Sequence, residues 1–147
     1  MVKPTIIANM GEGNVGKTDS IIMVYEKLCK RYGIEPIVLD KDICEVVKIN
    51  GIKVGISSFG DTRQMVKEHL DELKGKGCQI IVTACRNNHD MVCLLNEYDH
   101  YRIWRTSNAR LFEQNTHPRV APKGMLKRFN ENWAEEIANL IESWCYV

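Results

Sequence analysis

Eight residues near the start of the chain have types and a spacing suited to holding an anion. In order they are Gly11, Glu12, Gly13, Asn14, Val15, Gly16, Lys17 and Thr18. The glycines let the backbone curl so that successive N–H groups point inward, and a helix beginning near Gly16 aims the positive end of its dipole at the same point. The pattern therefore predicts an anion-binding loop, against the plainer alternative of a glycine-rich turn with an exposed lysine.

This loop fits G-x-x-x-x-G-K-[ST] between an expected strand and an expected helix, and so resembles the phosphate loop of the P-loop NTPases. The resemblance implies a nucleotide-binding set made of Gly11, Gly13, Asn14, Val15, Gly16, Lys17 and Thr18. It also implies that Lys17 acts in catalysis on the β- and γ-phosphates and that the Thr18 hydroxyl binds Mg²⁺. The cofactors that follow are Mg²⁺ and ATP or GTP.

The stretch GNVGKT also resembles the chromosome-partitioning ATPases, with one departure. Those proteins carry a lysine where this chain has Glu12, so their intersubunit lysine is not implied. Asp19 stands where many P-loop proteins have a hydroxyl residue for the α-phosphate, although an acid in the first helical turn suits the dipole.

A carboxylate near Mg²⁺ is expected at the end of a neighbouring apolar strand. Asp40 ends such a run at 36–40, and residues 39–42 resemble the Leu-Asp-x-Asp segment of adenylylsulfate kinases and the acidic strand end of partitioning ATPases. The resemblance implies Asp40 as a metal ligand and catalytic residue, with Asp42 facing the phosphates or an acceptor. The alternative is that both acids solvate a turn.

A second acidic candidate follows an expected hairpin. Residues 55–61 lie where Ras-like GTPases carry Asp-x-x-Gly; Ser57 replaces the acid, Gly60 is retained, and Asp61 follows. Either Asp61 or Thr62 can cap the helix expected over 62–74. For Asp61 the alternative role is a ligand near the metal, and we favour the cap.

The guanine-reading motif Asn-Lys-x-Asp is absent at 83–86, so guanine specificity is unsupported and ATP is favoured. Arg86 at this strand end is interpreted as a contact for phosphate or base, against the alternative of a surface arginine.

Basic residues gather between positions 101 and 128, where Glu113 is the only acid. They are Arg102, Arg105, Arg110, Arg119, Lys123, Lys127 and Arg128. Such a run could supply an arginine to the phosphates, a lid over 115–124, or a nucleic-acid contact through the interleaved aromatic residues. The alternative is a solvated face, which is the commoner case.

Periodicity and turn residues predict the elements that position these groups. Expected strands are 5–9, 36–40, 45–49 paired with 52–57 across Asn50-Gly51, 78–83 and 101–104. Expected helices run from the loop to Gly33, over 62–74, over 90–97, and over 126–144. The alternation predicts a three-layer α/β/α sandwich with a mostly parallel sheet and one antiparallel hairpin strand, in one P-loop domain over residues 1–147.

Composition narrows the function classes. The 147 residues carry a formal net charge of +1, so no global field attracts nucleic acid or membrane. The six cysteines lack metal-ligand spacing, and Cys78 and Cys85 lie in or beside an apolar run, which favours reduced, buried thiols. The first apolar run is too short for a signal peptide or a membrane span, so we expect a cytoplasmic protein without a membrane partner.

Three functions stay open. The first is Mg²⁺-dependent binding and hydrolysis of a nucleoside triphosphate, with ATP favoured. The second is a small-molecule or nucleotide kinase, in which Asp40 or Asp42 accepts the proton of the acceptor hydroxyl. The third is a non-catalytic nucleotide-binding module. A protein partner or a second copy of the chain is compatible with each.

Overall fold

The computed structural model describes residues 3–11, 17–37, 42–105, 110–111, 119–120 and 123–146. Within them a five-stranded sheet has the order β2-β3-β4-β1-β5. The strands are β1 (Thr5–Gly11), β2 (Cys44–Ile49), β3 (Ile52–Ser57), β4 (Ile80–Arg86) and β5 (His100–Ile103). All neighbouring pairs are parallel except β2 with β3. The predicted α/β class, mostly parallel with one antiparallel hairpin, is confirmed.

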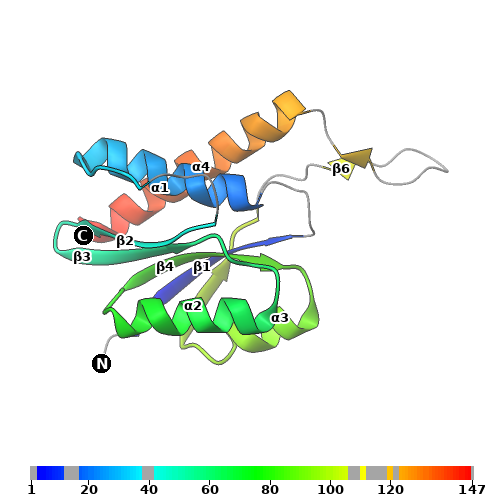
Figure 1. Ribbon diagram of the computed structural model, residues 1–147, viewed down its shortest axis with the longest axis horizontal. Coiled ribbons are helices and arrows are strands. Elements are labelled where there is room, and N and C mark those ends of the chain that lie inside the picture. Colours follow the sequence, from blue (N-terminus) through cyan, green and yellow to red (C-terminus); the bar gives the residue numbers. More distant parts are fainter. Residues whose placement is uncertain are drawn as a thin grey trace.

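Helices cover both faces of this sheet (Figure 1). The helices α1 (Lys17–Tyr32) and α4 (Lys123–Cys145) lie on one face, and α2 (Arg63–Gly75) and α3 (His89–Leu95) lie on the other. Two clusters of buried side chains fill the two interfaces. The first includes Ile7, Ile21, Leu28, Val82 and Ile137, and the second includes Ile6, Met10, Leu70, Ile81 and Leu94. The described elements therefore form three layers, with side chains of β1 alternating between the two cores.

The turn between β2 and β3 explains the antiparallel step. Asn50 has φ +50° and Gly51 has φ +80°, the pair of positive values that a two-residue hairpin turn requires. The turn fixes the register in which Val47 lies opposite Val54. The Asn50 side chain also donates a hydrogen bond of 2.8 Å to the carbonyl of Cys145, which ties the hairpin to the end of α4.

Helix ends agree with the sequence at some positions and differ at others. Gly33, with φ +65°, follows α1 as expected for a left-handed cap. The N-cap of α2 is Thr62 and not Asp61, so the favoured role of Asp61 is wrong. Thr62 has the extended backbone of a cap, and its hydroxyl accepts a hydrogen bond of 3.1 Å from the N–H of Met65.

The strand expected at 36–40 is not formed at its described end. Residues 34–37 have no regular structure, and Ile37 is 43% exposed. Pro36 has no N–H to give to a sheet, and the N–H of Ile37 lies 3.3 Å from the Tyr25 hydroxyl oxygen, which accepts its hydrogen bond. Residues 38–40, including Asp40, lie outside the described residues.

The loop expected over 115–124 also differs in part. Its residues Arg119–Val120 form strand β7, which pairs antiparallel with β6 (Arg110–Leu111) in a separate two-stranded ladder. Helix α4 begins at Lys123, inside the expected loop. Residues 112–118 lie outside the described residues, so the expectation of a lid there stays a prediction.

All six cysteines are free thiols, and Cys78 and Cys85 are buried as predicted. Burial raises the pKa of the Cys78 thiol, which keeps it protonated and makes it a small hydrophobic side chain. No helix in the described part of the chain is long and apolar enough to cross a membrane.

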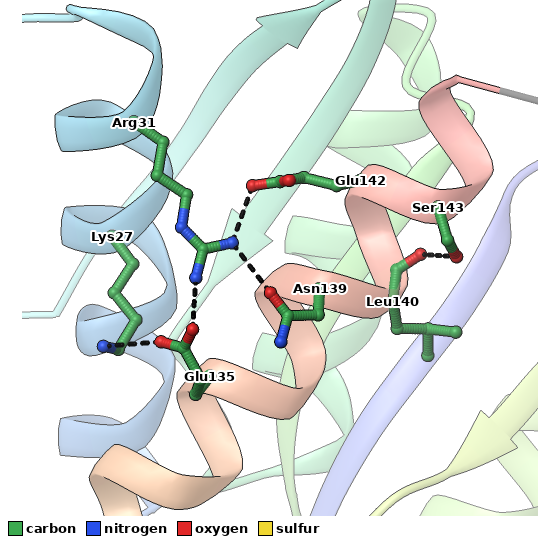
Figure 2. A network of polar contacts seen from close by, with 7 residues as sticks. All are labelled: Lys27, Arg31, Glu135, Asn139, Leu140, Glu142 and Ser143. Carbon is green, nitrogen blue, oxygen red and sulfur yellow. Dashed lines mark hydrogen bonds and ion pairs between the residues drawn. The ribbon is translucent and has the colours of Figure 1, made fainter.

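Charged side chains join α1 to α4 along their exposed flank (Figure 2). The Arg31 guanidinium lies 2.6 Å from carboxylate oxygens of both Glu142 and Glu135, and it donates a further hydrogen bond of 3.1 Å to Asn139. Lys27 lies 3.0 Å from Glu135. Contact with Lys27 and then with Arg31 lowers the pKa of Glu135, and contact with Glu142 raises the pKa of Arg31. The network links the helix after the glycine loop to the last helix.

Replacing Arg31 by Met tests this link. We expect the free energy of unfolding at pH 7 to fall by about 1 kcal/mol, because partly exposed pairs contribute little singly and share one arginine here. Because the folded-state pKa of Glu135 is lowered, its contribution is present at neutral pH and is lost as the pH falls through that pKa. Urea titrations at pH 7 and pH 3 measure both effects.

The matched control is Lys30→Met, which removes an exposed charge from the same helix. An equal loss of stability in both variants, or a loss from Arg31→Met that is the same at both pH values, would contradict the assigned network.

Candidate functional site

The glycine loop begins at the carboxyl edge of the sheet. Gly11 is the last residue of β1, which lies between β4 and β5, and Lys17 is the first residue of α1. The predicted strand and helix on either side of the loop are therefore confirmed. Thr18, in the first turn of α1, is exposed. The remaining predicted loop residues, Gly13, Asn14, Val15 and Gly16, lie outside the described residues.

A buried hydrogen bond joins the two arms of the loop. The Asn9 side-chain amide donates a bond of 2.8 Å to the Ser20 hydroxyl, and both residues are at most 1% exposed. Asn9 precedes Gly11 by two residues and Ser20 follows Lys17 by three, so the bond fixes where the chain leaves β1 and where it enters α1. A polar residue inside an apolar strand was the signal for this contact, because buried amides need partners.

Arg86, at the end of β4, lies beside the start of the loop. Arg86 and Gly11 are partners in the parallel register, and the N–H of Asn87 donates a bond of 3.1 Å to the Gly11 carbonyl. The Arg86 guanidinium is about half exposed and lies 3.6 Å from an Asp61 oxygen. The structure thus brings Arg86, Gly11 and Asp61 to one edge, and it gives Asp61 an arginine partner.

The segment after β3 is fixed tightly against β4. The N–H of Arg86 donates a bond of 3.2 Å to the Gly60 carbonyl, and a Cβ added to Gly60 would lie 2.7 Å from the Ala84 carbonyl carbon and oxygen. The Phe59 ring stacks on His69 of α2 with centroids 4.0 Å apart. Ser57 is fully buried, so its hydroxyl does not face solvent at this edge.

A described carboxylate, that of Asp42, lies at this edge in addition to Asp61, while Asp40 lies outside the described residues. Asp42 accepts a hydrogen bond of 2.9 Å from the Ser58 hydroxyl, whose oxygen accepts one of 2.8 Å from the N–H of Ile43. Ser58 is 2% exposed, so a buried group orients the Asp42 carboxylate. The Asp42 carboxylate and the hydroxyl of the exposed Thr18 are oxygen ligands of the kind that Mg²⁺ binds. Within the described ranges no three His, Cys, Asp or Glu side chains form a metal-binding group.

The predicted basic stretch is divided between different surroundings. The Arg102 guanidinium lies 5.9 Å from the centroid of the Trp144 ring, while Arg105 reaches the end of β1, where it donates a bond of 3.3 Å to the Met10 carbonyl. Lys127 and Arg128 are exposed on α4. From the sequence, Arg105 is only one of the seven basic residues between positions 101 and 128. Its contact with Met10 joins positions 95 residues apart, for which no local signal exists.

No family model, no curated protein and no solved structure matches this chain. The resemblance to P-loop NTPases rests on the loop sequence and on the strand and helix that flank it.

Gly60→Ala tests how tightly the segment after β3 is held. The added methyl group would meet backbone atoms of Ala84, which cannot rotate away, so we expect a loss of about 1–3 kcal/mol in the free energy of unfolding. Gly75→Ala is the control, because a Cβ there meets nothing within 4 Å and a helical alanine should be neutral or stabilising. Equal denaturation midpoints for the two variants would refute the close contact.

A double-mutant cycle with Asn9→Ala and Ser20→Ala tests the bond between the loop arms. A coupling of about 1 kcal/mol in the free energy of unfolding is expected, because the bond is shielded from water. Tyr101→Phe with Asn96→Ala is the matched cycle for an exposed bond of the same 2.8 Å length, and its coupling should be smaller. Additive effects of Asn9→Ala and Ser20→Ala would show that the arms are not joined.

Proposed function

We propose that this chain binds a nucleoside triphosphate, with ATP favoured, together with Mg²⁺, and hydrolyses it in the manner of a P-loop NTPase. One observation carries the proposal. The segment G-x-x-x-x-G-K-T connects the carboxyl end of an interior parallel strand to the first residue of a helix, the surroundings in which this motif cradles phosphates.

The charges at this edge support an anionic ligand. The amino end of α1 contributes a partial positive charge, and Lys17 is its first residue. Arg86 is the last residue of β4 and Arg105 is the second residue after β5, so the two come from the two sides of β1. Cationic groups thus lie where ligands bind in open α/β sheets, and one of them, Arg86, is paired there with Asp61.

The proposed roles follow from these positions. Backbone N–H groups of 11–18 surround the phosphates, Lys17 neutralises the charge that develops on them, and Arg86 contacts phosphate or base. Thr18 and Asp40 would hold Mg²⁺. Asp42 is a described carboxylate that has the same chemistry as Asp40. Bound Mg²⁺ would neutralise phosphate charge.

A kinase is the second candidate, favoured by one observation. The buried Ser58 hydroxyl orients the Asp42 carboxylate beside the carboxyl edge, as a base that accepts a proton from an acceptor hydroxyl requires. The two candidates differ in one measurement: a hydrolase releases phosphate with no acceptor present, and a kinase needs the acceptor.

Lys17→Ala should abolish the response of the protein to nucleotides. A ligand at 100 times its Kd adds about 2.7 kcal/mol to the free energy of unfolding, which raises the Tm of a domain of this size by roughly 5–10 °C. A thermal-shift screen of ATP, GTP, CTP and UTP with and without Mg²⁺ should show this rise for the wild type and for Lys30→Ala, and no rise for Lys17→Ala.

Two outcomes would overturn the proposal. One is a wild-type protein whose Tm no triphosphate raises, and the other is a Lys17→Ala variant that responds like the wild type. Binding without phosphate release, with or without acceptors, would instead identify a non-catalytic nucleotide-binding module.

A further inference from the structure

We propose that Arg105 is a positioning residue for the phosphate loop. It holds in place the loop root, which we define as Met10 and Gly11 at the end of β1. The inference rests on the proposed function, because it concerns the same loop. Arg105 is the second residue after β5, and its guanidinium reaches across the end of β1 to the segment that follows β4. It therefore contacts both the end of β1 and the residue that follows β4.

Two contacts define the position of this guanidinium. One nitrogen, Nη1, donates a bond of 3.3 Å to the Met10 carbonyl, and the other, Nη2, lies 3.4 Å from the Asn87 side-chain oxygen. The sulfur of Met10 lies 4.0 Å from Nη2. A planar guanidinium can serve acceptors on two sides with fixed geometry, which a lysine ammonium cannot match.

The end of β1 needs such a group because β5 is too short to pair with it. The ladder between β1 and β5 ends where Ala8 lies opposite Ile103, and the N–H of Trp104 donates the adjacent bond to the Ala8 carbonyl. Met10 lies beyond this ladder. The Arg105 side chain gives its carbonyl the hydrogen bond that a longer strand would have supplied.

The next carbonyl is held from the opposite side. The N–H of Asn87 donates to Gly11, and the Asn87 side chain accepts from Arg105. Arg105 and Asn87 thus form a bridge that fixes both carbonyls immediately before the loop. Because a phosphate-binding loop works by aiming several N–H groups at one point, an unfixed root would weaken phosphate binding without removing any group that touches phosphate.

The test compares Arg105→Ala, Arg105→Lys, Asn87→Ala and the double variant Arg105→Ala/Asn87→Ala by calorimetric titration with ATP and Mg²⁺. We expect Arg105→Ala to weaken binding roughly tenfold, because charge-assisted bonds contribute most among hydrogen bonds. Arg105→Lys should recover only part of the loss. The double variant should be about as weak as Arg105→Ala, because the two residues act as one bridge.

The control is Arg102→Ala, which removes an equal charge from β5 but from the side chain that lies over Trp144. Its affinity should stay within about twofold of the wild type, since exposed charges at a distance are screened. A loss equal to that of Arg105→Ala would mean that only net charge matters, and the inference would be wrong.

Amide hydrogen exchange without nucleotide separates this inference from the proposed function. Arg105→Ala should accelerate exchange in peptides covering residues 10–17 and leave α2 unchanged. Unchanged exchange at 10–17 would overturn the inference even where Lys17→Ala abolishes binding. If the wild type binds no nucleotide, the proposed function fails, while faster exchange would still assign Arg105 to the loop root. Fully additive losses of affinity in the double variant, with unchanged exchange, would instead indicate a direct contact with phosphate.

Discussion

Asn9 and Ser20 share a hydrogen bond inside the protein, between the strand that enters the glycine loop and the helix that leaves it. Burying an amide between a sheet and a helix without a hydrogen-bond partner would cost free energy. The bond therefore favours one position of α1 relative to β1. The loop spans a gap whose ends are set by that position. The contacts of Asn87 and Arg105 lie at the first of those two ends.

The carboxyl edge is fixed by contacts of differing strength. Gly60 lies so close to the backbone of Ala84 that no side chain fits, and the segment after β3 therefore follows β4 closely. The ion pair between Arg86 and Asp61 is exposed and 3.6 Å long, so it contributes little stability. A weak pair is easily exchanged, and the free energy needed to redirect Arg86 toward a ligand is correspondingly small. The backbone is closely packed at this point, whereas the Arg86 side chain is held by an exposed ion pair.

The parts of the fold that could be predicted from the sequence are those with local causes. The hairpin turn needs positive φ at Asn50 and Gly51, and the end of α1 needs it at Gly33; each requirement is readable from the residue itself. The run around Ile37 could not be judged in this way, because an apolar sequence is compatible with a strand but does not supply its partners. The N–H of Ile37 donates instead to the Tyr25 hydroxyl, in the helix that precedes the run, so the described end of the run has no strand partner.

The candidate site shows the same division. The loop was visible because all of its groups lie within eight residues, whereas Arg105 reaches Met10 across 95 positions and Ser58 reaches Asp42 across 16. Neither contact follows from composition or spacing; both follow from where neighbouring strands end. A short β5 leaves the Met10 carbonyl without a strand partner, and buried or partly buried carbonyls in proteins are seldom left so. Because β5 is short, the Met10 carbonyl beside the loop needs a hydrogen-bond donor from elsewhere, and the Arg105 side chain supplies it.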